Sequence, residues 1–333
     1  MAKESFKALV LDRKDGKVQA EIRRLGTDAL PEGDVLVAVA YSSLNYKDGL
    51  AVTGRAPIIR RYPMVPGIDL AGTVMESKSP EFQAGDQVLV TGCGIGEDHW
   101  GGYAEAARVS AEWLVRLPNG LMLQEVMGIG TAGFTAMLSV MALEERGLKP
   151  GGREVLVTGA AGGVGSMAVA ILAALGHRVV ASTGRPDLEP YLKSLGASRI
   201  IPRSEIAPAS DKALERKRWA GAVDSVGGDT LAAILRALEH GAGVAVCGLA
   251  GGSTLQTTVF PFILRGIALL GVASSSAPRA RRLAVWERVA RDLPREALHR
   301  MMQSAMLEDL PDLSRRIVEG KIRGRVVIDL AAT

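Results

Sequence analysis

Four closely spaced glycines form the segment of this sequence with the clearest chemical meaning. Gly159, Gly162, Gly163 and Gly165 lie between an apolar run typical of a strand and a run of small apolar residues typical of a helix. Where side chains are absent, the backbone can approach a pyrophosphate closely, and a helix N-terminus offers free N–H groups and a positive dipole end. The spacing Ala160-x-Gly162-Gly163-x-Gly165 in this context predicts a dinucleotide-binding loop rather than a simple tight turn.

The next apolar run indicates which dinucleotide this loop binds. Sites for NAD place Asp or Glu about 20 residues further on, to bind the ribose 2′-hydroxyl. Here the run "VVASTGR" ends with Ser182, Thr183 and Arg185. A carboxylate would repel a 2′-phosphate, whereas hydroxyls and a guanidinium attract one, so we predict a preference for NADP(H). Arg203, after the following strand, either reaches the same phosphate or lies in a solvated loop.

Alternating strands and helices are expected to position the loop. The pattern after residue 153 predicts strands at 154–158, 178–182, 199–202, 220–224, 242–248 and 267–272, and helices at 164–175, 187–195 and 228–239. Such alternation is typical of a doubly wound parallel sheet. The remaining chain predicts helices at 280–292, 295–304 and 309–319 and a last strand in "RGRVVIDL".

The chain before residue 121 has a different pattern. Short apolar runs such as "KALVLD", "DVLVAVAYSSL" and "DQVLVTG" are bounded by Gly, Pro and Asp. This spacing predicts a compact, barrel-like β domain. A length of 333 residues also favours two domains over one. Helices rich in Ala, Met and Leu are expected between the two parts, near residues 124–147.

The composition excludes several classes of function. The net charge of +4 is small and spread along the chain, so it does not indicate nucleic-acid or membrane binding. The basic clusters at 60–63 and 277–283 are expected to be solvated surface. Cys93 and Cys247 cannot form a disulfide framework or a four-cysteine zinc site. With no signal-peptide pattern and no continuous apolar span, we expect a cytoplasmic protein.

Several motifs resemble one family along almost the whole chain. The segments "SSLNYKDGLAVTG", "VPGIDLAGTV", "HWGGYAEAARV", "CGLAGG" and "TTVFPFILRG" resemble the medium-chain dehydrogenase/reductase superfamily, and within it the zinc-free quinone oxidoreductase branch that includes acrylyl-CoA reductases. The resemblance implies an α/β protein with a GroES-like β-rich catalytic domain (1–126 and 299–333) and a Rossmann cofactor domain (127–298). It also implies a homodimer formed partly through the cofactor domains.

The resemblance also suggests that the site holds no metal. Zinc-bearing members of the superfamily carry Cys in the segment that reads "LNYKD" here, and Gly-His-Glu where this chain has Gly67-Ile68-Asp69. Asn45 and Ile68 cannot replace those ligands, since catalytic zinc needs about three ligands of Cys, His or carboxylate type. Reduction of a conjugated carbonyl fits such a site, because the charge that develops is delocalised and hydrogen-bond donors can stabilise it.

Tyr46 and Asn45 are the candidate catalytic residues. A phenol donates a hydrogen bond at neutral pH, and the matching tyrosine in similar proteins touches the cofactor. Alternatively, Tyr46 only packs against the nicotinamide. Asn45 either orients the substrate or a ribose hydroxyl, or satisfies its own turn. Lys47 and Asp48 are expected to be a surface charge and a helix cap, and His99 to fix a loop.

The remaining candidates bind the cofactor or the substrate. Arg55, Arg60 and Arg61, shortly after Tyr46, could meet the phosphates of an acyl-CoA. The resemblance places Leu249 and Ile263 beside the nicotinamide, with apolar core as the alternative for both. It assigns the other cofactor contacts to Gly162, Gly163, Val164, Gly165, Ser182, Thr183, Gly184, Arg185 and Arg203, besides Tyr46.

Three functions are compatible with this sequence. The first is NADPH-dependent reduction of a short enoyl-CoA, with acrylyl-CoA as the expected substrate. The second is reduction of quinones or small enones on the same scaffold. The third is NADPH binding without catalysis, and the intact "LNYKD" segment argues against it.

Overall fold

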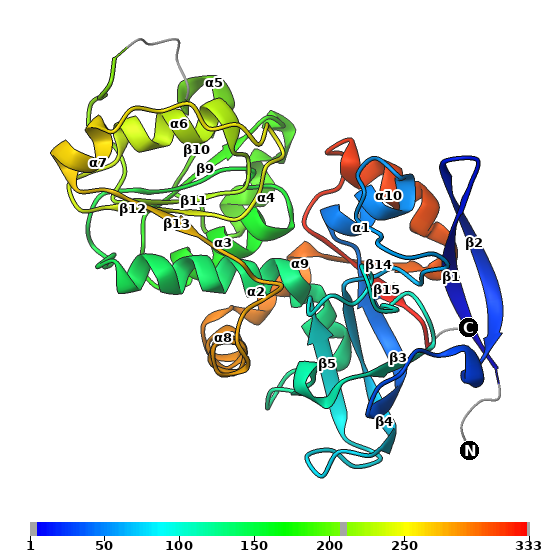
Figure 1. Cartoon of the computed structure of the whole chain (residues 1–333). Coiled ribbons are helices and arrows are strands. Elements are labelled where there is room, and N and C mark those ends of the chain that lie inside the picture. The colour runs from blue at the N-terminus through cyan, green and yellow to red at the C-terminus, as the bar shows by residue number, and fades with distance from the viewer. Residues whose placement is uncertain (1–4, 207–211, 332–333) are drawn as a thin grey trace. The chain divides into compact units, whose positions relative to one another are not determined.

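A computed structural model describes residues 5–206 and 212–331 (Figure 1). The chain divides into two compact units. The first comprises Met1–Thr131, Ser275–Ala290 and Met301–Thr333, and the second comprises Ala132–Ser274 and Arg291–Arg300. This division differs from the domain limits expected from the sequence chiefly in residues 275–290, which group with the first unit.

The first unit is built on antiparallel strands. β1 (Ser5–Lys14) and β2 (Lys17–Gly26) form a hairpin. A seven-stranded sheet has the order β14-β15-β3-β4-β5-β7, and β6 also pairs with β3. Its strands are β3 (Val35–Ser43), β4 (Asp69–Ser77), β5 (Gln87–Thr91), β6 (Ala106–Val109), β7 (Val115–Arg116), β14 (Met302–Met306) and β15 (Arg325–Asp329).

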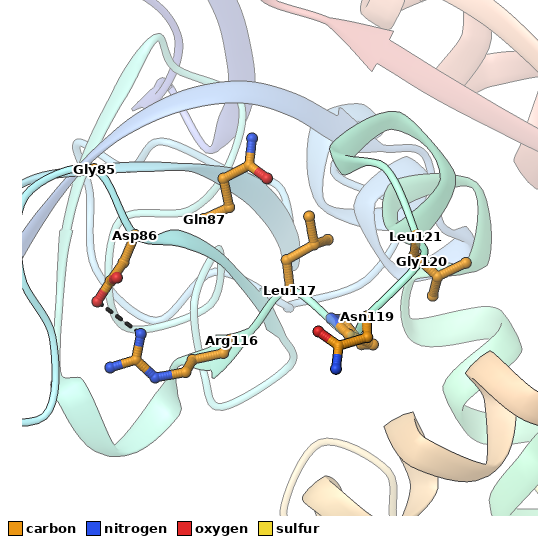
Figure 2. A pocket seen from close by; sticks show the side chains of 9 residues that line it. Gly85, Asp86, Gln87, Arg116, Leu117, Asn119, Gly120 and Leu121 are labelled. Atoms are coloured by element: carbon orange, nitrogen blue, oxygen red, sulfur yellow. Dashed lines mark ion pairs between the residues drawn. The ribbon is translucent and has the colours of Figure 1, made fainter.

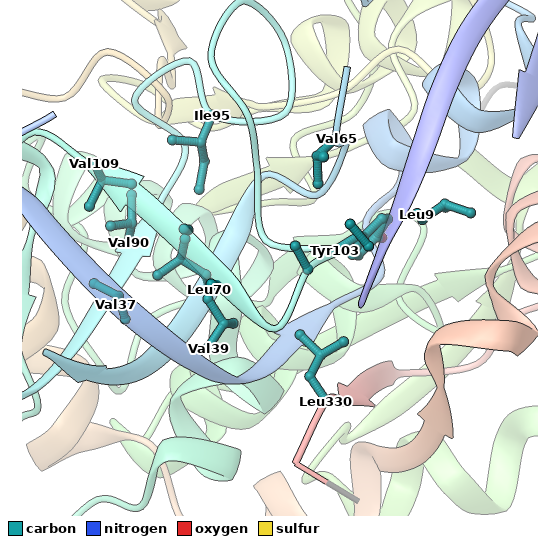
Figure 3. Close-up of a cluster of buried hydrophobic side chains, with 14 of the residues drawn as sticks. Leu9, Val37, Val39, Val65, Leu70, Val90, Ile95, Tyr103, Val109 and Leu330 are labelled. Atoms are coloured by element: carbon teal, nitrogen blue, oxygen red, sulfur yellow. The ribbon is translucent and has the colours of Figure 1, made fainter. Parts of the chain in front are cut away.

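The core of the first unit lies between these strands. Successive side chains of a strand point to opposite faces, so alternate residues reach the interior. Figure 3 shows the result, with Val37 and Val39 of β3, Leu70 of β4 and Val90 of β5 close together. Helices α1 (Tyr46–Thr53) and α10 (Leu310–Val318) belong to this unit and pack against each other. The start of α2 (Leu123–Glu145) and most of α8 (Arg279–Asp292) also belong to it.

The second unit contains a six-stranded parallel sheet. Its order is β10-β9-β8-β11-β12-β13, so the strands run outward from β8 in one direction and from β11 in the other. In doubly wound sheets the ligand binds at the carboxyl ends of the strands where this order reverses. The strands are β8 (Val155–Val157), β9 (Val179–Thr183), β10 (Arg199–Pro202), β11 (Gly221–Asp224), β12 (Gly243–Val246) and β13 (Ala268–Gly271).

Helices connect these strands (Figure 1). Helix α3 follows β8 and helix α6 follows β11, on opposite faces of the sheet, as right-handed crossovers in opposite directions require. Besides α1 and α10, the described residues form the helices α2 (Leu123–Glu145), α3 (Gly163–Ala174), α4 (Glu189–Ser194), α5 (Arg203–Ile206), α6 (Gly228–Ala237), α7 (Phe260–Arg265), α8 (Arg279–Asp292) and α9 (Arg295–Met301).

The structure corrects two expectations from the sequence. Residues 302–306 form strand β14 rather than the end of a helix, because they pair in parallel with β15. The basic cluster at 277–283 is only partly solvated. The Arg282 side chain is buried and donates to the Thr91 carbonyl at 2.5 Å, and Arg279 donates to the carbonyls of Ala111, Glu112 and Leu114. These bonds attach residues 275–290 to the first unit.

Helix α2 is the one described segment long and apolar enough to cross a membrane by length and composition alone. However, 89% of its most apolar window is buried within the protein, as in the core helix of a folded domain. Its backbone is also interrupted at Gly130, where φ is +51° and ψ is −161°. These features indicate a core helix.

Candidate functional site

The glycine loop begins where β8 ends. Gly159 has φ +57°, a left-handed conformation that favours glycine, and the Ala160 N–H donates to the Ser182 carbonyl at 3.1 Å. Gly162 is the N-cap of α3. A Cβ on Gly165 would clash with the Gly159 carbonyl oxygen and lie 2.6 Å from the Ala160 Cα. The loop therefore packs so tightly against the start of α3 that only glycine fits at position 165.

A buried carboxylate, which the sequence analysis did not identify, holds the base of this loop. Asp224 ends β11 and accepts hydrogen bonds from the Thr158 hydroxyl at 2.6 Å and the Gly227 N–H at 2.8 Å. The Ser225 hydroxyl donates in turn to the Thr158 carbonyl at 3.2 Å. Burial raises the pKa of Asp224. The available signal was the acid that ends an apolar run in "GAVDSVGG".

The end of β9 gathers the residues expected to recognise an adenosine phosphate. The Ser182 hydroxyl is buried and has no hydrogen-bond partner among the described residues. Thr183 accepts from the Arg185 N–H at 3.1 Å, and the Arg185 guanidinium donates to the Ala161 carbonyl at 3.3 Å. Arg203 lies against Gly184, where an added Cβ would be 3.4 Å from the arginine Nε.

An orphaned buried hydroxyl normally costs free energy, so this position calls for a ligand. Two guanidinium groups, from Arg185 and Arg203, flank the same strand end, and the described residues include no acid at that strand's last two positions. A dinucleotide carrying a 2′-phosphate fits this donor set, because its oxygens accept from hydroxyls and guanidinium groups. A ribose that needs a carboxylate partner fits it poorly.

The two apolar residues that the resemblance places beside the nicotinamide are exposed rather than buried. Leu249 is 60% and Ile263 is 67% exposed. Their exposure excludes the alternative that they are core residues. Leu249 follows β12, and its Cα lies close to Gly227 at the end of β11, so it belongs to the loops at the carboxyl ends of the strands. Ile263 is presented by α7.

Tyr46 is the first residue of α1, in the first unit. Tyr46 is 40% exposed, although the residue before it, Asn45, is buried. The preceding Asn45 is the N-cap, and its N–H donates to the Asp48 carboxylate at 3.0 Å in a capping box. This confirms that Asp48 caps the helix. Lys47 is half-buried and forms an ion pair of 2.8 Å with Glu97.

The Asn45 amide contacts buried partners of its own unit. Its Nδ2 donates to Asp69 Oδ2 at 2.8 Å and to Asp48 Oδ2 at 3.1 Å, and its Oδ1 accepts from Arg325 Nη1 at 3.1 Å. These contacts favour the alternative in which Asn45 satisfies its own turn. Burial, followed by the nearby Asp69 charge, raises the pKa of Asp48 to about 7. Arg325 was not identified from the sequence.

Arg55, Arg60 and Arg61 are exposed on the segment that follows α1. Arg55 lies 4.0 Å from Glu319, and Arg61 donates to the Asp98 carbonyl at 3.3 Å. His99 Nε2 lies 2.7 Å from the Arg108 carbonyl oxygen and its ring contacts Trp113 edge to face, which confirms its role in fixing a loop.

A hollow of about 520 Å³ lies elsewhere on the first unit (Figure 2). Its polar lining includes the ion pair of Asp86 and Arg116, 2.8 Å apart. Gln87, at the start of β5, also lines it, whereas Thr91 at the other end of β5 pairs with Asp69. The hollow is therefore separate from the Tyr46 region.

The side chains present do not fit a catalytic zinc ion. Asn45 and Ile68 offer an amide and a hydrocarbon where zinc-bearing proteins of this type have thiolate and imidazole, and the Asn45 amide contacts carboxylates and a guanidinium. Within residues 5–206 and 212–331, no three His, Cys, Asp or Glu side chains are grouped so that they could hold a metal ion.

Family models match both parts of the chain. Residues 31–119 match the alcohol dehydrogenase GroES-like domain, and residues 163–291 match the zinc-binding dehydrogenase model. The acrylyl-CoA reductase AcuI of Ruegeria pomeroyi is 54% identical over 329 residues, which cover 98% of this chain and 100% of that protein.

Two solved structures resemble the chain closely. The yhdH oxidoreductase of Salmonella enterica, in complex with NADP, has a TM-score of 0.95 at 52% identity and covers 97% of this chain and 99% of its own. The yhfP protein of Bacillus subtilis, with NAD bound, also has a TM-score of 0.95, at 46% identity, covering 98% and 100% of the two chains.

Proposed function

Because the chain belongs to the zinc-free branch of the medium-chain dehydrogenase/reductases, we propose that it reduces the C=C bond of a short enoyl-CoA with NADPH, acrylyl-CoA to propionyl-CoA being the expected reaction. The observation that carries this function is the 54% identity to an acrylyl-CoA reductase along 98% of the chain. The orphaned Ser182 hydroxyl and the two guanidinium groups at the end of β9 support NADPH as the reductant.

The chemistry needs a hydride at the β-carbon, a stabilised thioester oxygen, and a proton from solvent at the α-carbon, where it ends the enolate. NADPH, when bound, supplies the hydride. Gly162, Gly163, Val164 and Gly165 would hold its pyrophosphate at the start of α3, and Ser182, Thr183, Gly184, Arg185 and Arg203 its 2′-phosphate. Leu249 and Ile263 are proposed to flank the nicotinamide.

Tyr46 is proposed to act on the substrate. When hydride adds to the β-carbon, negative charge moves onto the thioester oxygen, and a phenol at hydrogen-bond distance would stabilise it. The exposure of Tyr46, next to the buried Asn45, suits this role. Asn45 contributes by holding the start of α1 rather than by contacting substrate.

Arg55, Arg60 and Arg61 are proposed to bind the CoA phosphates. Helix α1 carries Tyr46 at its start and ends at Thr53, about 10 Å further along at 1.5 Å per residue, and Arg55 follows two residues later. The pantetheine arm of CoA separates its thioester from its phosphates, so a distance of this order suits one substrate that reaches both. Guanidinium groups bind phosphate oxygens by charge-assisted hydrogen bonds.

A cytoplasmic homodimer is the proposed form of the protein. The edge strand β13 pairs only with β12 in its sheet, and Leu269 of β13 is 42% exposed. Val259, Phe260, Ile263 and Leu264 add exposed apolar side chains in the segment before it. An unpaired edge with apolar neighbours is suited to pairing with a second copy of the same chain.

One kinetic comparison tests this function. The oxidation of NADPH and NADH is followed with acrylyl-CoA, crotonyl-CoA and a benzoquinone. Saturable turnover with acrylyl-CoA and NADPH, and little with the quinone, is expected. The reverse preference would favour quinone reduction, the activity for which a Bacillus subtilis relative, the putative quinone oxidoreductase YhfP, is named.

Two sets of variants test the proposed roles of Tyr46 and of the three arginines that follow α1. Tyr46→Phe should bind NADPH normally and keep only a small, measurable fraction of the wild-type turnover, which would also exclude a protein that only binds the cofactor. Arg55→Ala, Arg60→Ala and Arg61→Ala should raise KM for acrylyl-CoA without changing KM for a thioester that lacks phosphates. Arg116→Ala, at a distant exposed arginine, is the matched control.

A further inference from the structure

Three charged side chains are buried together beneath the start of α1. Asp48, Asp69 and Arg325 come from α1, β4 and β15, and each is at most 2% exposed. Burying charges costs free energy unless each charge is paired and hydrogen-bonded. The hydrogen bonds that offset this cost show what the cluster holds in place.

Asp69 accepts hydrogen bonds from three directions. Its Oδ2 receives the Ser43 hydroxyl at 2.6 Å, the Asn45 amide at 2.8 Å and the Thr131 N–H at 2.9 Å. Its Oδ1 receives the Thr131 hydroxyl at 2.6 Å. One carboxylate thus binds the end of β3, the cap of α1 and the point where α2 resumes after its interruption at Gly130.

Arg325 contacts the same elements. Its Nη1 donates to the Leu44 carbonyl at 3.0 Å and to Asn45 Oδ1 at 3.1 Å, and its Nε donates to the Gly128 carbonyl at 2.9 Å. Its Nη2 donates to the Ser43 hydroxyl at 2.8 Å. The guanidinium therefore fixes the backbone directly before Tyr46.

The atoms of this cluster leave no room for a side chain at position 130. A Cβ on Gly130 would lie 2.6 Å from both Arg325 Nη2 and Asp69 Oδ2 and 2.9 Å from the Ser43 hydroxyl. The other carboxylate, Asp48, accepts the N–H groups of Asn45 and Ile68 at 3.0 Å. The backbone at the α1 cap and the backbone directly before β4 are therefore both bound to the cluster.

We propose that Asp69, together with Asp48 and Arg325, is a positioning residue that fixes the backbone of Asn45 and Tyr46 and so presents the Tyr46 phenol in one orientation. This inference rests on the proposed function, since it gives the phenol its task. The cluster touches neither substrate nor cofactor in this account, and acts through Tyr46. The precise placement of a catalytic group by a buried network is what keeps its hydrogen bond aligned with the developing charge.

One of the titratable groups that face Asp69 changes its charge near neutral pH. The titratable or charged groups facing the cluster are Asp48 on α1, Arg325 on β15 and Tyr103 before β6. Burial raises the pKa of the Tyr103 phenol, which therefore stays neutral near pH 7. Burial lowers the pKa of Arg325, but a guanidinium keeps its charge in proteins. Asp48, with its pKa raised to about 7, does change its charge near neutrality.

The central test replaces Asp69 with a side chain of the same shape. Asp69→Asn removes the charge and puts an amide NH₂ where an oxygen accepts hydrogen bonds. We expect kcat with acrylyl-CoA to fall at least tenfold, while KM and the NADPH Kd change less than twofold. Asp86→Asn, the same substitution in the ion pair with Arg116, should leave all three unchanged.

A double-mutant cycle separates positioning from a general structural role. If Asp69 acts through Tyr46, Asp69→Asn should cost little further kcat in the Tyr46→Phe background. Hydrogen–deuterium exchange in residues 43–49 should be faster in Asp69→Asn, and this readout does not depend on the substrate. If the wild type fails to reduce acrylyl-CoA, the proposed function fails while exchange still tests the positioning.

Definite outcomes would overturn the inference. A folded Asp69→Asn with wild-type kcat and unchanged exchange would do so, as would a full kcat loss that persists in Tyr46→Phe. If Asp69→Asn does not fold, Ser43→Ala takes its place, because Ser43 bonds to both Asp69 and Arg325. The same cycle with Tyr46→Phe and the same exchange measurement then decide.

Discussion

The stability of the first unit should fall as pH rises from 5 to 8, because of one buried acid. Burial and the Asp69 charge raise the pKa of Asp48 from 3.8 to about 7 in the native state. Between these values the native chain holds a proton that the unfolded chain releases. An acid whose pKa is higher in the native state therefore stabilises the fold below pH 7. This contribution to the free energy of unfolding disappears as the pH rises through the native pKa.

The magnitude follows from the two pKa values. At about 1.4 kcal/mol per unit, the contribution of Asp48 should decrease by about 3 kcal/mol between pH 5 and 8. Asp48→Asn cannot titrate and has the same shape, so the difference in unfolding free energy between wild type and variant isolates this contribution. Other titrating groups cancel in that difference.

Urea unfolding followed by tryptophan fluorescence suits this measurement. Trp100, Trp113 and Trp286 lie in the first unit, and Trp219 lies in the second. The wild type should lose stability relative to Asp48→Asn as pH rises. A difference that stays constant from pH 5 to 8, or grows in favour of the wild type, would refute the reasoning that Asp48 is protonated in the native state.

Three further predictions concern the second unit. Gly165→Ala should weaken NADPH binding at least tenfold by titration, because its Cβ meets the Gly159 carbonyl oxygen; unchanged affinity would show that the loop has room. Arg185→Ala and Arg203→Ala should each weaken NADPH about 10- to 100-fold, as expected for charge-assisted bonds, and leave NADH unchanged; equal losses for both nucleotides would contradict 2′-phosphate recognition. Leu269→Arg should shift the species seen by light scattering from dimer to monomer, and a persisting dimer would place the interface elsewhere.

The parts of the fold that follow from local pattern were predictable. Apolar runs and helix starts gave the order of strands and helices in the second unit, and the glycine spacing located its loop. The exceptions have physical causes. β2 (Lys17–Gly26) is exposed or half-buried in a two-stranded hairpin, so it has no continuous apolar run, and its alternation of Val18, Ala20 and Ile22 with polar residues was not recognised as a strand. β14 exists only because β15 pairs with it.

The buried cluster could not be predicted from local pattern. Arg325 and Ser43 are 282 positions apart, and no periodicity connects them. Asp69 lies in the segment "VPGIDLAGTV", which carries part of the family resemblance. The sequence considered on its own indicated only that Gly67-Ile68-Asp69 lacks the zinc ligands of related proteins, and assigned Asp69 no role. For Asn45 the sequence left two roles open, orienting the substrate or a ribose hydroxyl and satisfying its own turn, and its buried amide contacts favour the second. The role of a polar residue depends on partners that the fold supplies from distant segments.

The pairing of β15 with β3 has a consequence for synthesis of the protein on the ribosome. β15 pairs with β3 within the sheet and supplies Arg325, yet it ends at residue 329. All six strands of the parallel sheet, by contrast, have been synthesised once Gly271 has been added, before β14 and β15 are made. The parallel sheet can therefore begin to form while translation continues, whereas the sheet of the first unit stays incomplete until β15 has left the exit tunnel.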